Sequence, residues 1–407
     1  MNERLVIVGG GVAGIRVVES ARAAGFDGDI TMICDEAHPP YERPPLSKQV
    51  LAGDYDERIL FPRDSGELDA LRIDMRLGIR AVALDRAGAA IELEDGERVL
   101  YDFLVIATGA RARTLPFDHP AGVYTIRTIQ DSLAISAELA GRPRVAVVGA
   151  GFIGLEVAST ARALGCAVTL IESGRVPLVR ALGQTMGVHC AALHESRGVN
   201  VLTRGRVVGF TANGRVTGVV LDDGVLPVDL VVVGIGAIPN VEWLEGSGLR
   251  LEDGVLCDED GRADPSGRIY ALGDVAAWWN PARRAHVRQE HWTSAGDQAL
   301  HVGRLIAGEQ VRPFATVPYF WSDQHGTKIQ MAGVATDRDD LTVLHGSLPE
   351  GRFLATYSRD GDLTAILGFD SPRLVAHYRA LLSRGGTLAD ARALADKLTP
   401  AREAALS

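Results

Sequence analysis

Cysteine is scarce in this sequence, with four residues in 407, at Cys34, Cys166, Cys190 and Cys257. They are scattered along the chain, with no Cys-x-x-Cys pair and no spacing typical of zinc ligands. We therefore expect neither a metal site nor a redox-active dithiol.

Long hydrophobic runs and an excess of positive charge are also missing. No apolar stretch reaches the ~20 residues of a membrane-spanning helix. The first candidate strand begins at Leu5, which leaves no room for a signal peptide. The formal net charge of −10 argues against nucleic acid as a partner, although it does not exclude a local basic patch. We expect a cytoplasmic protein that binds neither nucleic acid nor membrane.

Glycine, in contrast, is clustered near the N-terminus. An apolar run at 5–8 leads into the glycine-rich segment 9–14, which is followed by a helical stretch at 15–24. A second strand at 30–33 then ends close to Glu36. This order of strand, turn, helix, strand and acid predicts a βαβ unit of a buried parallel sheet.

The same pattern recurs about 140 residues later. Strand 145–148 leads into the glycine-rich segment 149–154, a helical stretch at 155–164, and a strand at 167–171 that ends at Glu172. A duplicated dinucleotide-binding fold is the simplest account of this internal repeat.

Each glycine cluster is a G-x-G-x-x-G fingerprint with an acid ~20 residues further on. The first glycine makes a tight turn, the second lets the backbone approach a pyrophosphate, and the third lets helix and strand pack closely. The acid accepts a hydrogen bond from the adenosine ribose. The two sets are Gly9, Gly11, Gly14 with Glu36, and Gly149, Gly151, Gly154 with Glu172. One fingerprint alone is a weak signal, but two in strand–turn–helix context predict two dinucleotide sites.

Which dinucleotides bind is less directly encoded. Two nicotinamide sites, or one vestigial site, would also fit the repeat. Asp274, after Gly273 at a strand end, favours FAD because its carboxylate can accept from ribityl hydroxyls, although it could instead cap the next segment. Glu172 favours NADH because a carboxylate repels the 2′-phosphate of NADPH. Arg175 could overturn this preference for NADH, because it is close enough in sequence to Glu172 to bind the 2′-phosphate of NADPH.

The pattern changes after Pro239. A helical stretch spans 287–306, strand signals follow at 328–334, 352–358 and 363–369, and a last helical stretch spans 372–383. We interpret the end of the chain as a separate α+β domain without a fingerprint of its own.

Five further segments resemble the NADH-dependent ferredoxin reductases of bacterial oxygenase systems, whose parent fold is that of glutathione-reductase-like FAD enzymes. They are PYERPPLSK at 40–48, ATGA at 107–110, YALGDVA at 270–276, EHW at 290–292 and VPYFWSDQ at 317–324. The resemblance covers essentially the whole chain.

The fold expected is α/β, with two Rossmann-like dinucleotide-binding domains and an α+β C-terminal domain. The FAD-binding domain would be discontinuous, with residues 1–112 and 238–314. The NADH-binding domain would span 113–237, and the C-terminal domain 315–407.

The resemblance also implies site residues. Lys48 would lie at the isoalloxazine, Trp292 near the flavin ring, and Glu156 near the nicotinamide carboxamide; these three are the candidate catalytic residues. FAD would contact Gly9, Gly11, Val12, Ala13, Gly14, Glu36, Arg43, Lys48, Val82, Ala107, Thr108, Gly109, Arg127, Gly273, Asp274, Glu290, His291 and Trp292. NADH would contact Gly149, Gly151, Phe152, Ile153, Gly154, Glu156, Glu172 and Gly236.

The three candidate catalytic residues also have plainer interpretations. Lys48 could be an ordinary loop lysine, and Trp292 an ordinary core residue. Glu156, which we expect in the first turn of its helix, would gain from the helix dipole whatever its function.

The implied activity is that of a ferredoxin–NAD(+) reductase, most simply a monomer. NADH would pass a hydride to the flavin, and electrons would then leave one at a time for a 2Fe–2S ferredoxin, because no thiol relay is available. Since such ferredoxins are commonly acidic, the stretch 283–288, with Arg284 and Arg288, is a candidate docking face; a solvated turn is the alternative.

Three other functions remain open from the sequence. A rubredoxin reductase is poorly separated from the favoured interpretation. An NADH oxidase or peroxidase would need a flavin-proximal cysteine, whereas Cys34 looks structural at a strand end. A flavoprotein that acts as a binding or signalling module would need basic or targeting segments that the sequence does not show.

Overall fold

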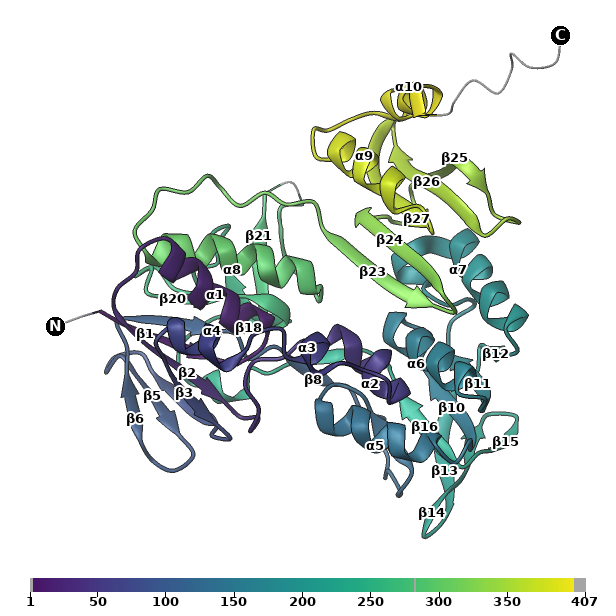
Figure 1. Cartoon of the computed structure of the whole chain (residues 1–407), viewed down its shortest axis with the longest axis horizontal. Helices are drawn as coiled ribbons and strands as arrows, with labels where there is room; N and C mark the ends of the chain where they lie inside the picture. Colours follow the sequence, from purple (N-terminus) through teal and green to yellow (C-terminus); the bar gives the residue numbers. More distant parts are fainter. Residues whose placement is uncertain (1–2, 282, 399–407) are drawn as a thin grey trace. The chain divides into compact units, whose positions relative to one another are not determined.

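The computed structural model describes residues 3–281 and 283–398 (Figure 1). The chain folds into two compact units, each formed by segments that are distant in sequence. Unit 1 comprises Met1–Leu46, Asp54–Ala112 and Ala237–Thr316. Unit 2 comprises Ser47–Gly53, Arg113–Gly236 and Val317–Ser407. The three-domain division expected from the sequence remains a prediction.

Unit 1 is built on a five-stranded parallel sheet in the order β20-β7-β1-β2-β3. Its strands are rich in β-branched and aliphatic residues because both faces of the sheet are covered. The strands are β1 (Arg4–Val8), β2 (Asp29–Cys34), β3 (Ile73–Leu77), β7 (Phe103–Ile106) and β20 (Ile269–Ala271).

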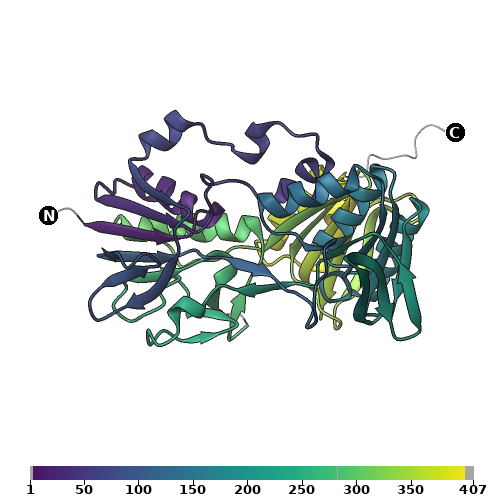
Figure 2. The same ribbon diagram turned by 90° about the horizontal axis from the view of Figure 1, so that it is seen from below.

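Two helices of unit 1, α1 (Val12–Ala23) and α8 (Trp292–Ile306), lie side by side (Figures 1 and 2). The Ser20 hydroxyl donates to the Leu300 carbonyl at 2.8 Å. A Cβ at Gly303 would stand 2.5 Å from the Ser20 Cβ. The missing side chain at Gly303 therefore allows the two helices to pack closely.

The remaining elements of unit 1 are short. Its helical segments are α3 (Glu57–Leu60), α4 (Ser65–Ala70), η2 (Glu242–Leu244) and η3 (Gly273–Val275), and η1 (Pro44–Ser47) leads out of it. Its other strands are β4 (Ala81–Asp85), β5 (Ala90–Leu93), β6 (Arg98–Leu100), β8 (Ala110–Ala112), β17 (Ala237–Pro239), β18 (Leu251–Glu252), β19 (Gly254–Cys257), β21 (Ala276–Asn280) and β22 (Ala285–Arg288).

Strand β22 corrects the helix that the sequence predicted from Val287. Residues 285–288 pair antiparallel with β21, with Trp278 opposite Val287. The chain turns back on itself before this segment, so its polar groups are satisfied by the hairpin ladder rather than by helical bonds. Helix α8 begins only at Trp292.

Unit 2 contains a second five-stranded parallel sheet, in the order β12-β11-β10-β16-β9. Its strands are β9 (Val123–Thr125), β10 (Arg144–Val148), β11 (Ala167–Glu172), β12 (Asn200–Thr203) and β16 (Leu230–Val233). Its helices are α2 (Gln49–Ala52), α5 (Ile129–Leu139), α6 (Phe152–Ala163) and α7 (Val179–Ser196). A three-stranded sheet contains β13 (Val207–Asn213), β14 (Arg215–Leu221) and β15 (Gly224–Pro227).

Helix α6 starts earlier than the sequence predicted. It begins at Phe152, because the last residues of the fingerprint already form its first turn. Glu156 therefore lies in the second turn of α6, whereas the sequence predicted that it would lie in the first. The dipole acts mainly within the first turn, so it does not by itself account for an acid at this position.

The C-terminal part of unit 2 is an antiparallel sheet in the order β23-β24-β27-β26-β25. Its elements are β23 (Tyr319–Gln324), β24 (Thr327–Gly333), β25 (Asp340–Ser347), β26 (Arg352–Arg359), β27 (Asp362–Phe369), α9 (Pro372–Leu382) and α10 (Leu388–Leu398). Helix α10 was not expected. Its signal is the reciprocal pair Thr387 and Asp390, each of whose side chains accepts from the other's backbone N–H.

The C-terminal sheet shares a hydrophobic core with the parallel sheet of unit 2. Buried Leu170 and Met186 belong to the same apolar cluster as buried Ile329 and Phe353. Unit 1 has a core of its own around its parallel sheet. The expected α/β class, with two Rossmann-like folds and an α+β C-terminal part, is confirmed.

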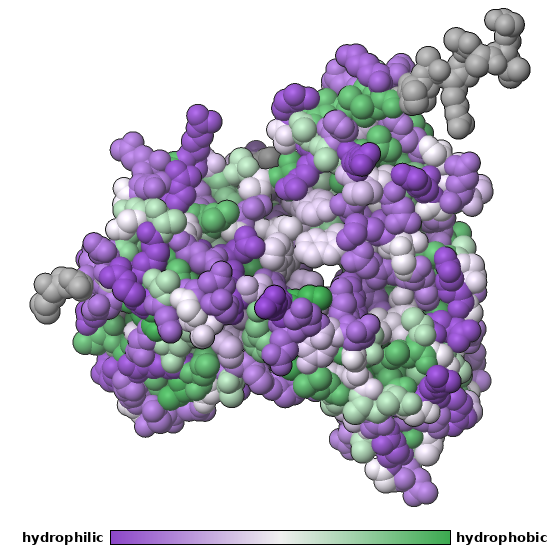
Figure 3. Space-filling model, viewed as in Figure 1, coloured by the Kyte–Doolittle hydropathy of each residue, from purple (hydrophilic) through white to green (hydrophobic). Residues whose placement is uncertain are grey.

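The surface is mixed in character. On the face drawn in Figure 3, hydrophilic residues are interspersed with smaller hydrophobic areas. Within residues 3–281 and 283–398, no helix is both long enough and apolar enough to cross a membrane.

Candidate active site

The first fingerprint of the chain forms a backbone cradle at the start of α1. Gly9 has φ +118°, and a Cβ there would collide with the Ala107 carbonyl. A Cβ at Gly14 would collide with the Gly9 carbonyl, so the helix can approach the strand only at a glycine. At Gly11, which caps α1, a Cβ would meet nothing within 4 Å. The cradle is thus closed toward the protein and open at Gly11, which is what a pyrophosphate needs.

The second fingerprint repeats this geometry at the start of α6. Gly149 has φ +100°, and a Cβ there would collide with the Gly234 carbonyl. A Cβ at Gly154 would collide with the Gly149 carbonyl, while a Cβ at Gly151 would meet nothing within 4 Å. Neither α1 nor α6 carries an acid in its first turn. Both helix N-termini can therefore accept an anionic group, and both cradles fit a dinucleotide.

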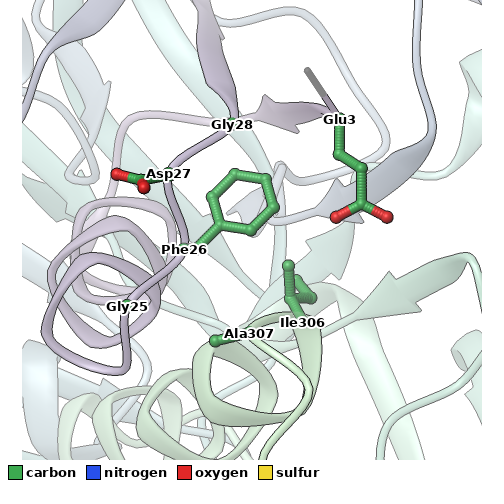
Figure 4. A pocket seen from close by; sticks show the side chains of 7 residues that line it. All are labelled: Glu3, Gly25, Phe26, Asp27, Gly28, Ile306 and Ala307. Atoms are coloured by element: carbon green, nitrogen blue, oxygen red, sulfur yellow. The ribbon is translucent and has the colours of Figure 1, made fainter. Parts of the chain in front are cut away.

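A separate pocket of about 260 Å³ in unit 1 has the wrong character for such a ligand (Figure 4). It lies beyond the C-terminal end of α1, where the helix dipole disfavours anions. Its lining includes the acidic residues Glu3 and Asp27, together with Phe26 and Ile306. We therefore place no dinucleotide there.

The acid that follows the first fingerprint is held by aromatic and basic neighbours. The Tyr41 hydroxyl donates to Glu36 Oε2 at 2.6 Å, and the Arg43 guanidinium pairs with Glu36 Oε1 at 2.7 Å. Arg43 also lies over the Tyr41 ring, 5.0 Å from its centroid. Burial alone would lower the pKa of Arg43, but Tyr41 and Glu36 outweigh it, so the pKa is raised. The PYERPPLSK segment therefore fixes the orientation of Glu36.

The acid that follows the second fingerprint is held by backbone instead. Glu172 Oε2 accepts from the Ala150 N–H at 2.9 Å, and Oε1 from the Gly174 N–H at 2.6 Å. Its carboxylate is thus fixed beside the glycine turn. Arg175 is exposed to solvent.

The other predicted FAD residues of unit 1 lie in loops, in helices and in one strand around its parallel sheet. Thr108 exchanges two bonds of 2.9 Å with Asn240, one from its hydroxyl to the Asn240 carbonyl and one from the Asn240 amide to its own carbonyl. Gly273 has φ +73° and donates its N–H to Gln298 Oε1 at 2.8 Å. Val12 and Ala13 begin α1, Ala107 and Gly109 flank Thr108 after β7, Asp274 lies in η3, and Val82 is an exposed residue of β4.

Trp292, the first residue of α8, is held from two sides within unit 1. Its indole N–H donates to the Glu42 carboxylate. The Arg16 guanidinium lies over its ring, 4.7 Å from the centroid. Just before it, His291 caps α8, and burial lowers the pKa of this imidazole. Trp292 is therefore a positioned side chain, and its holders Glu42 and Arg16 were not anticipated from the sequence.

Two of the predicted catalytic residues, Lys48 and Glu156, meet inside unit 2. Lys48 Nζ lies 2.6 Å from Glu156 Oε2, and the side chains are 15% and 6% exposed. The Ser47 hydroxyl donates to the same oxygen at 2.5 Å. The Ser322 hydroxyl donates to Glu156 Oε1 at 2.7 Å. Glu156 is thus a buried carboxylate with three donors, a set we name the Glu156 cluster.

The sequence missed the two serines of this cluster. Ser47 adjoins Lys48 in the PYERPPLSK segment, and Ser322 lies within VPYFWSDQ. Both motifs were noted, but no pattern along the chain indicates that their hydroxyls meet one carboxylate.

The remaining predicted residues of unit 2 are spread over three elements. Phe152 opens α6 and packs against Phe320, with ring centroids 4.4 Å apart. Ile153 beside it is 45% exposed. Gly236 follows β16 with φ +107°, and Arg127 precedes α5, where its N–H donates to Asp131 at 2.9 Å.

All four thiols are buried. Burial raises the pKa of Cys34 and Cys190 to about 12, and also raises the pKa of Cys166 and Cys257. Cys34 packs against the first fingerprint, since a Cβ at Gly10 would stand 2.5 Å from its sulfur. A thiol that is both buried and protonated is not a nucleophile. No group of three or more metal-binding side chains occurs in the described ranges.

The basic stretch at 283–288 is less basic than its sequence indicates. Arg288 pairs with Asp253 at 3.0 Å and with Glu290 at 2.6 Å, and its side chain is only 11% exposed. Its charge is therefore neutralised within unit 1. Arg283 and Arg284 are exposed.

Comparison with known proteins places these features in a family. Residues 3–299 match the family described as pyridine nucleotide-disulphide oxidoreductase, and residues 319–405 match the reductase C-terminal family. The chain belongs to the pyridine nucleotide-disulphide oxidoreductases. Membership implies an oxidoreductase that uses a flavin and NAD(H), in agreement with the two cradles.

Individual relatives of this pyridine nucleotide-disulphide oxidoreductase are similar over more than four fifths of their length. The ferredoxin–NAD(+) reductase component of an anthranilate 1,2-dioxygenase system from Burkholderia cepacia is 39% identical, over 96% of each chain. Rhodocoxin reductase from Rhodococcus erythropolis is 39% identical, over 86% of this chain and 82% of its own. The covalent putidaredoxin reductase–putidaredoxin complex contains a chain with TM-score 0.90 and 33% identity, covering 94% of each chain. The resemblance to ferredoxin reductases noted in the sequence is thus confirmed.

Proposed function

We propose that this chain is a ferredoxin–NAD(+) reductase of an oxygenase system, which takes electrons from NADH through FAD and delivers them singly to a 2Fe–2S ferredoxin. The observation that carries the proposal is the pair of complete cradles in a chain whose thiols are all buried. With no reactive thiol, electrons must pass directly from flavin to an external acceptor. The similarity to ferredoxin reductases along nearly the whole chain supports the same conclusion.

In unit 1, FAD would be held by the first fingerprint. Gly11 would admit the pyrophosphate to the N-terminus of α1, and Glu36, fixed by Tyr41 and Arg43, would accept from the ribose. Asp274 would accept from the ribityl hydroxyls. When bound, a flavin supplies the chemistry that connects a two-electron hydride donor to one-electron acceptors.

In unit 2, NADH would be held by the second fingerprint, with its adenosine ribose on Glu172. Glu156 would accept from the nicotinamide carboxamide. A carboxylate offers about four acceptor positions, and Ser47, Lys48 and Ser322 occupy three of them. The predicted flavin contacts of Lys48 and Arg127, which also belong to unit 2, remain predictions. Hydride transfer depends on such positioning more than on acid–base help.

The alternative enzyme classes differ from a ferredoxin reductase in the electron acceptor that they use. The buried thiols count against an NADH oxidase or peroxidase that works through cysteine. A rubredoxin reductase would use the same two cradles, and only the acceptor would distinguish it.

The test compares acceptors under one set of conditions. With NADH as donor, we expect slow oxygen consumption and rapid reduction of cytochrome c that depends on an added 2Fe–2S ferredoxin. Ferricyanide, which needs no docking, serves as the control for flavin reduction. Fast oxygen or peroxide turnover without ferredoxin would instead establish an oxidase, and a preference for rubredoxin over ferredoxin would establish a rubredoxin reductase.

A second prediction concerns donor choice. Glu172→Ser should lower kcat/KM for NADH by about 10-fold and raise the relative use of NADPH by 10-fold or more, because repulsion of the 2′-phosphate disappears. Steady-state kinetics with both donors measures the ratio. Arg175→Ala serves as the control and should leave the preference for NADH unchanged. Use of NADPH by the wild type that disappears in Arg175→Ala would instead mean that Arg175 decides donor choice.

A further inference from the structure

A chain of hydrogen bonds leads from Glu156 to His325, in the turn that follows β23. The Ser322 hydroxyl, which donates to Glu156, lies 3.0 Å from Gln324 Nε2. Gln324 Oε1 lies 3.1 Å from His194 Nε2, and His194 Nδ1 lies 3.1 Å from His325 Nε2. We name these five residues the Glu156 relay. It joins helices α6 and α7 to strand β23 and the turn that follows it.

Each hydrogen in the relay can point in only one direction. An ionised carboxylate only accepts, so the Ser322 hydroxyl donates to Glu156 and must accept from the Gln324 amide. The Gln324 carbonyl then requires a proton on His194 Nε2. His194 Nδ1 is left as an acceptor, so His325 must donate from Nε2. Every link therefore donates toward Glu156.

The surroundings keep both histidines in the neutral form that this arrangement requires. His194, Ser322 and Gln324 are fully buried. Burial lowers the pKa of His194. Burial, together with the neighbouring His194 imidazole and the charges of Arg197 and Arg162, lowers the pKa of His325 to about 4. Loss of one link would leave a buried polar group without its partner, which is costly.

We propose that Ser322, Gln324, His194 and His325 are positioning residues that hold Glu156 as a fixed acceptor for the nicotinamide carboxamide. Ser47 and Lys48 hold Oε2 while the relay holds Oε1, so the carboxylate cannot rotate. One acceptor position remains on Oε1 and matches one amide N–H. The consequence is selectivity for a pyridine ring that carries an amide. This inference rests on the proposed oxidation of NADH in unit 2.

The test uses an analogue that lacks the amide N–H. In 3-acetylpyridine adenine dinucleotide, a methyl group replaces the amide nitrogen. Equilibrium binding of this analogue and of NAD⁺ to the oxidised holoenzyme gives a ratio of dissociation constants. In the wild type we expect NAD⁺ to bind about 10-fold more tightly. Ser322→Ala and His194→Leu, on different elements, should reduce that ratio to about 2-fold, whereas Ser322→Thr, which keeps a hydroxyl, should restore it.

The matched control is Ser358→Ala, which removes another buried serine hydroxyl from the same antiparallel sheet. It should keep the 10-fold ratio. A general loosening of unit 2 would weaken the binding of NAD⁺ and of the analogue equally, so the ratio of their dissociation constants would stay the same in every variant. That result would overturn the proposal.

A second readout follows Lys48 directly. The chain has three lysines, Lys48, Lys328 and Lys397, so labelling with [ε-¹³C]lysine gives three NMR signals. The Lys48 signal should move in Ser322→Ala and stay in place in Ser358→Ala, with Lys328 and Lys397 as internal references. An unmoved Lys48 signal would also overturn the proposal. Failure of the proposed oxidation of NADH in unit 2 looks different, because the wild type itself would then not bind NAD⁺.

Discussion

Substituting valine for the open glycine of each cradle should show which cradle binds FAD and which binds NADH. Gly11→Val is expected to yield a protein without bound flavin, whereas Gly151→Val should remain yellow but be reduced by NADH only at much higher NADH concentrations. Each added side chain would stand in open space, where the pyrophosphate has to lie. Both glycines have extended backbone, with φ −76°, so valine strains neither fold.

The measurements are the flavin spectrum after purification and the rate of flavin reduction by NADH. For Gly151→Val we expect KM for NADH to rise by about 100-fold, or about 2.7 kcal/mol. Gly141→Val, at an exposed glycine outside both cradles, should behave like the wild type. If Gly151→Val lost the flavin and Gly11→Val kept it, the assignment of the two fingerprints would be reversed.

The buried pair of Lys48 and Glu156 should show strong energetic coupling. Lys48→Met leaves the buried Glu156 carboxylate without its cation and should lower the free energy of unfolding by about 3 kcal/mol. Glu156→Gln should also lower the free energy of unfolding, because it replaces the charged partner of the Lys48 ammonium with a neutral amide. The double variant Lys48→Met/Glu156→Gln should regain more than half of the loss, since it leaves neither charge.

Denaturant unfolding of all four proteins gives the coupling energy, and NADH reduction kinetics gives the functional effect. Activity should fall by about 100-fold in every variant, including the restabilised one, if both side chains position reactants. The surface pair Arg144–Asp229, which is 2.7 Å apart and about half exposed, is the control. Asp229→Asn should lower the free energy of unfolding by less than ~1 kcal/mol. Additive effects of the two buried substitutions would contradict the prediction.

The sequence predicted the two parallel sheets well because their signals are local. Apolar strands, glycine turns and acids at fixed spacing all lie within one βαβ unit, and both cradles have the expected form. Element boundaries were less accurate. The first turns of α1 and α6 lie inside the fingerprints, so Glu156 was placed one turn too early. Strand β22 was taken for helix because its partner β21 lies across a turn that the pattern did not reveal.

The sequence predicted candidate site residues within single motifs, but not the contacts between residues of different motifs. Spacing pointed to Glu36 and Glu172 as candidate ribose-binding acids, but it did not reveal the groups that hold them. Ser322 lies 166 positions from Glu156, so no spacing rule connects them. Arg288 looked like part of a basic face because its acids, Asp253 and Glu290, are brought to it by the fold. Contacts of this kind follow from tertiary structure and leave no periodic trace along the chain.

The shared core of unit 2 limits how related enzymes can exchange their C-terminal segments. The two family matches meet near residues 299–319, which looks like a natural point for recombination. Yet Tyr357 of the C-terminal sheet donates to the Leu182 carbonyl at 2.7 Å, and Gln324 bonds His194. A graft joined at that point would inherit one half of a core and one half of a hydrogen-bond chain from different parents. The parallel sheet of unit 2 and the C-terminal sheet therefore have to be inherited together. The two segments match separate families along the sequence, but in the fold they form one evolutionary unit.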